Sequence, residues 1–230
     1  MAKRSWLRTL ATIAAAITIT VTGAARSVSA APPPPVSTPA ATPTPAGEVK
    51  SWNFDHDEAG KMASGWKAIV GDWQVLADST APSQPNAFGL PPGRVLTTLA
   101  HLLEYYPHAI LDDPAEYSDF TYEAQFKAPV NFHFDCSGGI IFRYVDDNNY
   151  YLLSAGCPSD YFALSRVTAG KLAVLKQQVL RTDPGTWYNL KVVAQGSHFS
   201  CFENDKLVFD VDDGKFAAGR IGLWARDDSQ

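Results

Sequence analysis

Three cysteines and five histidines are the only soft metal-ligand side chains in this 230-residue sequence. None of them has the spacing of zinc ligands, so a structural zinc site is not indicated. The sequence also has no Gly-x-Ser-x-Gly elbow, no Walker loop and no dinucleotide-binding glycine pattern. On these grounds we set aside serine hydrolases, nucleotide-binding proteins and dinucleotide-cofactor enzymes. No long helical stripe of apolar residues is present, which argues against a mainly helical fold.

Instead, apolar and polar residues alternate at every second position along much of the sequence. Phe120, Tyr122 and Phe126 alternate with polar residues, which is typical of a strand with one buried and one wet face. Turn residues such as 183–185 and 212–214 separate these strands, and only 99–106 suggests a helical turn. We expect a two-sheet antiparallel jelly-roll sandwich, an all-β fold of the concanavalin A-like type. The other expected strands are 49–54, 66–70, 73–77, 137–144, 149–153, 161–167, 172–179, 187–194, 198–203, 206–211 and 220–224.

The N-terminus has the pattern of an export signal over residues 1–30. A basic start precedes an apolar run, Leu10–Val21, and a small-x-small cleavage site ends at Ala30. The run is shorter than the about 20 residues that a membrane helix needs, so an uncleaved anchor is the weaker alternative. Residues 31–47 are rich in Pro, Ala and Thr and predict an extended linker. Residues 48–230 then form one sandwich domain in a secreted, periplasmic or cell-surface protein.

The charge balance bears on the partners of this domain. The formal net charge of the whole chain is -5, and residues 1–30 carry four basic residues and no acidic one. Without them, 15 basic residues stand against 24 acidic ones, a net charge of −9. Such an acidic surface argues against nucleic acid and anionic lipid, and we expect no membrane insertion of the mature domain. A glycan or another cell-envelope ligand, or a bound cation, suits it better.

Two strands joined by an Asp/Asn turn, 137–144 and 149–153, predict a β-hairpin. Pairing of Tyr144 with Asn149 would place Cys136 directly across from Cys157, where a disulfide can form. Cys201 would then be a buried free thiol or an intermolecular link.

Motifs along most of residues 48–224 resemble known exported β-sandwiches. They are residues 52–55, 65–66, 71–75, 117–120, 137–144, 149–151, 187–192 and 219–224. The chain resembles concanavalin A-like, laminin-G-like sandwiches, and is similar to the 3-keto-disaccharide hydrolase domain group. This resemblance implies a carbohydrate-related function on a jelly-roll scaffold.

Two features depart from the related glycosidases of family 16. Those enzymes carry a Glu-x-Asp-x-x-Glu core, because retaining chemistry needs two close carboxylates. Here Asp119 and Glu123 would lie about 13 Å apart along an extended strand. The closing Phe-Asp-Asp-Leu-like strand of the family is also absent after residues 220–224. We therefore expect either a fragment or a sheet with one open edge.

Five residues form the candidate ligand site. If neighbouring strands pair as expected, they line one wet sheet face with charged and aromatic side chains suited to sugars: Glu123, Arg143, Tyr150, Arg166 and Trp224. A solvated face with a cross-strand ion pair explains the same pattern equally well.

No cofactor is expected, although two Asp-rich turns invite comparison with calcium loops. Asp55 and Asp57 flank His56, and Asp210, Asp212 and Asp213 precede a glycine. Neither turn has the full spacing of a calcium loop, and ordinary Asx turns explain them better. His133 and His198 are isolated among apolar strand residues, which favours packed or hydrogen-bonded histidines over general bases.

Three functions remain open at this stage. The first is an exported carbohydrate-binding module that recognises a glycan or cell-wall ligand without glycosidase chemistry. The second is a hydrolase or lyase acting on 3-keto-glycosides, with Glu123 as base and Arg143 as carbonyl clamp. The third is a structural adhesion module that uses an open sheet edge.

Overall fold

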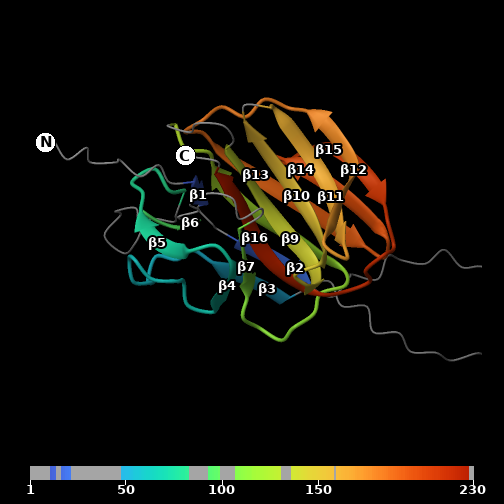
Figure 1. Cartoon of the computed structure of the whole chain (residues 1–230), viewed down its shortest axis with the longest axis horizontal. Coiled ribbons are helices and arrows are strands. Elements are labelled where there is room, and N and C mark those ends of the chain that lie inside the picture. Colours follow the sequence, from blue (N-terminus) through green and yellow to red (C-terminus); the bar gives the residue numbers. More distant parts are fainter. Residues whose placement is uncertain are drawn as a thin grey trace, which may run out of the picture.

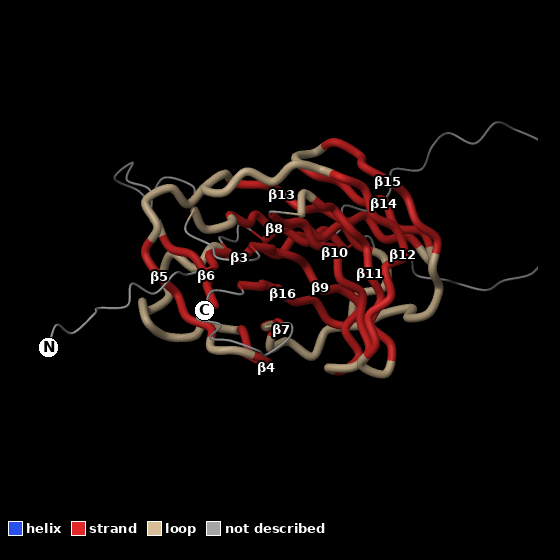
Figure 2. The backbone as a smooth tube through the Cα atoms, turned by 45° about the horizontal axis from the view of Figure 1, so that its top comes forward, coloured by secondary structure: helices blue, strands red, loops and turns tan. Residues whose placement is uncertain are grey.

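The computed structural model describes residues 11–13, 17–21, 48–82, 93–98, 107–130, 136–157 and 159–227. These residues form strands and loops in two facing antiparallel sheets, as the sequence predicted (Figure 1). Within the described residues no helix is assigned, and the tube in Figure 2 alternates between strands and connecting loops. The predicted helical turn at 99–106 lies outside the described residues.

Sheet A has nine strands. Its main path runs β15-β14-β13-β8-β1-β6-β5, and β2 pairs with both β8 and β3 beside this path. In chain order the strands are β1 (Ala11–Ile13), β2 (Ile17–Val21), β3 (Glu48–Trp52), β5 (Trp73–Ala77), β6 (Arg94–Thr98), β8 (Phe120–Lys127), β13 (Trp187–Gln195), β14 (His198–Glu203) and β15 (Lys206–Asp212).

Sheet B has seven strands in the order β12-β11-β10-β9-β16-β7-β4. In chain order they are β4 (Trp66–Val70), β7 (His108–Leu111), β9 (Cys136–Asp146), β10 (Asn149–Cys157), β11 (Tyr161–Thr168), β12 (Lys171–Val179) and β16 (Arg220–Asp227).

The main core lies between the sheets. In β8 the buried residues Phe120, Tyr122, Ala124 and Phe126 alternate with partly exposed ones, as the alternating pattern predicted. Each fully buried aromatic side chain contributes about 2–3 kcal/mol to folding, so this single strand supplies a large share of the hydrophobic stabilisation. The Tyr122 hydroxyl donates to the Gly222 carbonyl oxygen at 2.8 Å, which joins the two sheets with a buried hydrogen bond.

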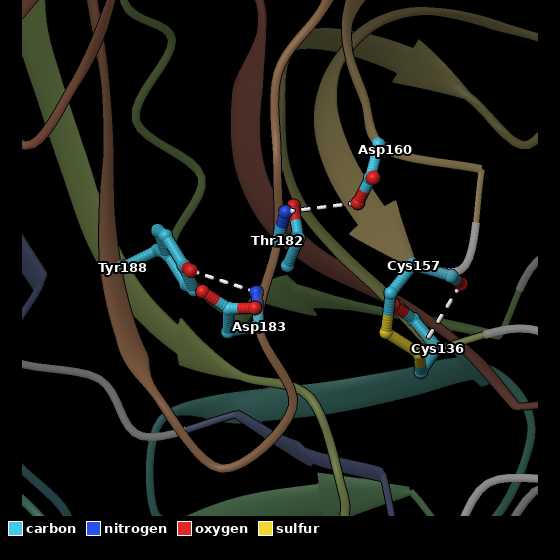
Figure 3. Close-up of a disulfide and its surroundings, with 6 residues drawn as sticks. All are labelled: Cys136, Cys157, Asp160, Thr182, Asp183 and Tyr188. Atoms are coloured by element: carbon cyan, nitrogen blue, oxygen red, sulfur yellow. Dashed lines mark hydrogen bonds between the residues drawn. A yellow bond between two sulfur atoms is a disulfide. The ribbon is translucent and has the colours of Figure 1, made fainter.

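The β9–β10 hairpin carries the predicted disulfide. Cys136 and Cys157 are direct cross-strand partners with Cα atoms 5.2 Å apart, and they are disulfide-bonded (Figure 3). Nearby, the backbone N–H of Thr182 donates to the Asp160 carboxylate at 3.2 Å (Figure 3). Cys201 is a buried free thiol, and burial raises its pKa to about 12. The disulfide and the Thr182–Asp160 hydrogen bond hold the end of the sandwich where β10 stops.

The leader and linker predictions fall largely outside the described residues. Residues 22–47 are not described, and the assignments of 1–30 as an export signal and 31–47 as a linker remain predictions. Two described segments of the leader, β1 and β2, pair with sheet A. Within the described part of the chain there is no helix that is both long and apolar enough to cross a membrane.

Candidate functional site

The five residues expected on one face lie at three separate places. Glu123 is on the outer face of sheet A, where alternation with Tyr122 and Ala124 turns it away from the core. Asn189 of β13 donates its side-chain N–H to the Glu123 carboxylate at 3.3 Å. Lys191 is the direct cross-strand partner of Glu123. This is the polar, partly exposed face of an ordinary antiparallel sheet.

Arg143 points inward rather than outward, which corrects the expected wet face. The residue has a φ of 46°, and the register of β9 shifts at this point against both of its neighbours. As a result Asn149 pairs with Asp146, not with Tyr144. A β-bulge adds one residue and reverses the alternation beyond it. A Cβ at Gly219 would lie 2.5 Å from the Arg143 carbonyl carbon, so glycine is needed beside the bulge.

The guanidinium of Arg143 holds the end of the sandwich together. The side chain is 1% exposed and donates to the carbonyl oxygens of Phe216 at 2.8 Å, Ser118 at 2.7 Å and Gly196 at 2.6 Å. It also lies over the Phe199 ring, 4.9 Å from the centroid. Burial lowers the pKa of this guanidinium. These contacts make Arg143 a structural residue that joins three loops.

Arg166 belongs to the same end of the molecule. It forms an ion pair with Asp213, and the Tyr151 hydroxyl donates to the other Asp213 carboxylate oxygen at 2.5 Å. Burial works against the Asp213 carboxylate, but its hydrogen bonds from Tyr151 and its Arg166 partner lower its pKa overall. Arg166 therefore fixes the 213–216 loop on the inner side of sheet B.

Tyr150 and Trp224 are the two predicted residues that lie together. Both belong to a second apolar cluster on the outer face of sheet B, away from the main core. The cluster residues are Ile110, Ile141, Tyr144, Tyr150, Leu152, Val167 and Trp224. A solvated outer face needs no such cluster, so this side of the sandwich differs from the outer face of sheet A.

A pocket of about 200 Å³ opens beside this cluster, over β10, β11, β12 and β16. Its described lining residues are Leu152, Ser154, Tyr161, Ala163, Ser165, Leu172, Val174, Gln177, Trp224 and Arg226. The lining residues of β10, β11 and β16 alternate along their strands with residues of the main core, and those of β12 pair with outward-facing residues of β11. The pocket therefore lies on the outer face of sheet B.

The hollow follows from a row of small residues across the sheet. Cross-strand partners run from Gln177 to Ala163, Ser154, Gly139 and Trp224. The three central members are small, and the two end members are large. A Cβ at Gly139 would lie 2.9 Å from Leu152 Cδ1 and 2.8 Å from the Leu153 carbonyl oxygen. The missing side chain at Gly139 therefore keeps the row low between Gln177 and Trp224.

The lining combines ring surfaces with polar groups. Trp224 is only 2% exposed and contributes a wall, whereas Tyr161 is partly exposed and Gln177 is exposed. Hydroxyls come from Ser154 and Ser165, and Arg226 is the single charged side chain in the described lining. Such a pocket can stack a ring-shaped ligand and hydrogen-bond its polar substituents.

The titratable groups with shifted pKa values lie elsewhere. Burial raises the pKa of Glu203 on β14 to about 7, which places its titration near neutral pH. His198 contacts Asp212 at 2.8 Å, and this partner raises the pKa of the imidazole. Across the described residues no group of three or more His, Cys, Asp or Glu side chains is arranged to hold a metal ion.

The expected shared trough of five residues is thus not formed. Sequence reasoning found Trp224 but missed Ser154, Tyr161, Ala163 and Gln177. A signal for them existed in the run of small residues around Gly139, which breaks the pattern of large side chains in the hairpin.

Residues 53–229 match the family described as the 3-keto-alpha-glucoside-1,2-lyase-like domain. The chain belongs to this family. The match spans most of the chain and confirms the resemblance inferred from the sequence motifs.

Two relatives from Bacillus subtilis are similar to the chain. Levanase of strain 168 is 26% identical over 161 residues, which is 70% of this chain but only 20% of levanase. The solved structure of the carbohydrate-binding module CBM66 is 24% identical, with a TM-score of 0.55, over 72% of this chain and 92% of the module. The structural likeness supports the β-sandwich fold.

Proposed function

We propose that this protein is an exported carbohydrate-binding module that holds a sugar in the outer-face pocket of sheet B. The observation that carries the proposal is the pocket itself, with ring surfaces from Trp224 and Tyr161 and hydrogen-bonding groups from Ser154 and Gln177. The two relatives, a levanase and a carbohydrate-binding module, support the same class of ligand.

The binding chemistry follows from the two faces of a sugar. Its C–H groups form an apolar surface that packs against Tyr161 and the exposed Leu172 and Val174, with the buried Trp224 closing the wall behind them. Its hydroxyls accept and donate hydrogen bonds at the pocket rim. Arg226 supplies a planar fork that donates two parallel hydrogen bonds to paired oxygens. A volume of about 200 Å³ corresponds to about seven waters of about 30 Å³ each, so the pocket suits one ring.

Export and the setting of the ligand remain part of the proposal. The basic start, apolar run and small-x-small site of residues 1–30 support secretion, and the acidic remainder of the chain favours a neutral glycan at the cell envelope.

The test compares two neighbouring glutamines of β12. Gln177 pairs with Ala163 of the pocket, whereas Gln178 pairs with Phe162 on the opposite face. Both side chains are exposed, so neither change to alanine endangers the fold. On a panel of immobilised fructans, glucans and cell-wall polysaccharides, we expect Gln177→Ala to weaken retention of the bound glycan about 10-fold, as for loss of one good hydrogen bond. Gln178→Ala keeps wild-type retention.

Absence of retention on every polysaccharide by the wild-type protein would refute the proposal. If both variants are retained equally on a glycan that the wild-type protein binds, the binding site lies outside this pocket.

A second candidate is cleavage of a 3-keto-glycoside, favoured by the family match. The predicted pair of Glu123 and Arg143 does not suit this chemistry, because Arg143 is buried at the end of the sandwich. Release of free sugar from a 3-keto-disaccharide by the wild-type protein would establish this activity, and full turnover by Glu123→Gln would remove Glu123 as its base. No release by the wild-type protein would exclude it for that substrate.

A further inference from the structure

The pocket of sheet B has a polar half and an apolar half. Most of its lining belongs to rows of cross-strand partners on β10, β11 and β12. In order along the sheet these rows are Gly156–Tyr161–Val179, Ser154–Ala163–Gln177, Leu152–Ser165–Val174 and Tyr150–Val167–Leu172. Hydrogen-bonding side chains line the pocket in the first two rows, whereas the last two rows are apolar except for one serine. The polar and apolar groups of a ligand are therefore received at different ends.

Two apolar side chains of the apolar half are open to solvent. Leu172 is 38% exposed and Val174 is 52% exposed, and both line the pocket. They lie two positions apart on one face of β12, the marginal strand of sheet B. Single exposed apolar residues are common on protein surfaces, but a pair that continues the wall of a pocket marks a place for the apolar part of a ligand.

One sugar ring does not cover this apolar half. Tyr161 and Val167 lie near opposite ends of β11, and Val167 is the partner of Leu172. At the rise of an extended strand they are about 20 Å apart. A ring that is held at the polar half touches Leu172 and Val174 only with its nearer edge. Much of their apolar surface is then left for a substituent on the ring.

Two buried hydroxyl groups line the same pocket. Ser154 and Ser165 are each 4% exposed. Within the described part of the chain, neither hydroxyl takes part in a hydrogen bond. Burial of a hydroxyl without a partner is unfavourable, so both are suited to a polar atom of a ligand. Ser165 lies between Leu152 and Val174, at the border of the two halves.

We propose that the sugar bound in this pocket carries a short acyl chain. The inference rests on the proposed function and names the class of ligand for the same site. The ring lies at the polar half, beside Ser154 and Gln177. The ester carbonyl oxygen accepts a hydrogen bond from the Ser165 hydroxyl at the border. The alkyl part of the acyl group then covers Val174 and Leu172 and removes their apolar surface from water.

The size of the apolar half limits the acyl chain. Positions 172 and 174 are about 6.6 Å apart along the strand, which a chain of a few carbon atoms spans. Each CH₂ group that leaves water strengthens binding about fourfold. The two CH₂ groups of a butanoyl ester should therefore strengthen binding of the sugar at least about 10-fold.

The test uses defined probes in NMR titrations of the full chain. The probes are glucose and fructose, the complete set of their mono-O-butanoyl esters, and the matching O-butyl ethers, which lack the carbonyl group. Val174→Thr replaces one methyl group by a hydroxyl and keeps the branched shape of the side chain. Val145→Thr is the matched control, because Val145 is 55% exposed and lies outside the pocket lining. Ser165→Ala removes the hydroxyl that the ester requires.

We expect at least one ester to bind about 10-fold or more tightly than its free sugar, and more tightly than its ether. Val174→Thr should weaken that ester about fourfold and change the free sugar by less than about twofold. Ser165→Ala should make the ester and the ether equal, and Val145→Thr should change neither. Gln177→Ala should weaken the free sugar and the ester alike.

Three results would overturn the acyl assignment. They are esters that bind no more tightly than the free sugars, ethers that equal the esters in the wild-type protein, and an ester advantage that Val174→Thr leaves unchanged. In each case the proposed function still stands if a polysaccharide is retained in a manner that depends on Gln177. Loss of retention on all polysaccharides refutes the proposed function itself, which separates the two failures.

Discussion

The two outer faces of this sandwich differ in kind. On sheet A, Thr121, Glu123 and Gln125 of β8 are polar and partly exposed, and the neighbouring Lys191 lies over the Phe202 ring. On sheet B, a buried apolar cluster that includes Tyr150 and Trp224 adjoins a pocket. An antiparallel sandwich requires only its inner faces to be apolar. The second cluster on sheet B is therefore what distinguishes a binding face from a solvated one.

The largest expected effect is a loss of folding stability when Arg143, at the buried end of the sandwich, is replaced. Arg143→Met should reduce the free energy of unfolding by about 3–5 kcal/mol, because it leaves three loop carbonyl groups without their charged donor. Lys171→Met, at the exposed start of β12, should change it by less than about 0.5 kcal/mol. Guanidinium unfolding measures both. An Arg143→Met protein with wild-type stability and lost glycan retention would instead make Arg143 a ligand-binding residue.

The disulfide should have the next largest effect. Replacing Cys136 and Cys157 together by serine removes a cross-link over 21 residues, which stabilises a domain by about 3 kcal/mol. Cys201→Ala is the control, because that thiol is free and its replacement leaves the cross-link intact. Thermal unfolding under non-reducing conditions should show a much larger drop for the double serine variant. Equal melting temperatures for the double variant and the wild type would show that hairpin pairing alone suffices.

A matched pair of phenylalanine substitutions contrasts the two faces directly. Ala163→Phe places a ring in the pocket of sheet B, whereas Thr121→Phe places one on the outer face of sheet A. We expect the first to abolish glycan retention and the second to leave it within about twofold, since one bulky side chain fills a pocket for one ring. Calorimetric titration with the retained glycan measures the difference. Loss of binding in Thr121→Phe alone would transfer the ligand face to sheet A.

The smallest effect concerns pH. Burial raises the pKa of Glu203 from 4.5 to about 7, so the folded state binds more protons than the unfolded state between these values. Stability should therefore fall as the pH rises from 4.5 to 7, by about 1–2 kcal/mol once solvent around this partly exposed group is considered. Glu203→Gln should remove this slope and be more stable than the wild type at pH 8. Parallel unfolding curves for the two proteins across this range would contradict the pKa assignment.

Local patterns predicted much of the fold. The alternation in Phe120–Lys127 predicted the buried face of β8. The Cys136–Cys157 pair was also predicted correctly. Asn149 pairs with Asp146 at the turn, but the bulge that follows brings the strands into the expected register. Both depend on residues that are close in sequence or joined by one turn. The family motifs identified the jelly-roll class for the same reason.

The site was less accessible to sequence reasoning. One residue with a positive φ, Arg143, inserts a bulge that reverses the alternation, and the glycine that permits it, Gly219, is far away in the chain. The pocket lies along a row of cross-strand partners on five strands, and Ala163, Ser154 and Gly139 of this row become neighbours only through strand order. The pairing of Thr12 and of residues 18–21 with β8 was equally invisible, since their composition satisfies an export signal and a strand alike.

The most direct test of the account is a two-dimensional NMR titration with the retained glycan, following side-chain resonances on both faces. We predict that the Trp224 indole N–H and the Gln177 amide shift with the same saturation curve, while the Asn189 amide beside Glu123 does not move. Saturable shifts at Asn189, with Trp224 and Gln177 unchanged, would contradict the assignment of the outer face of sheet B as the binding face.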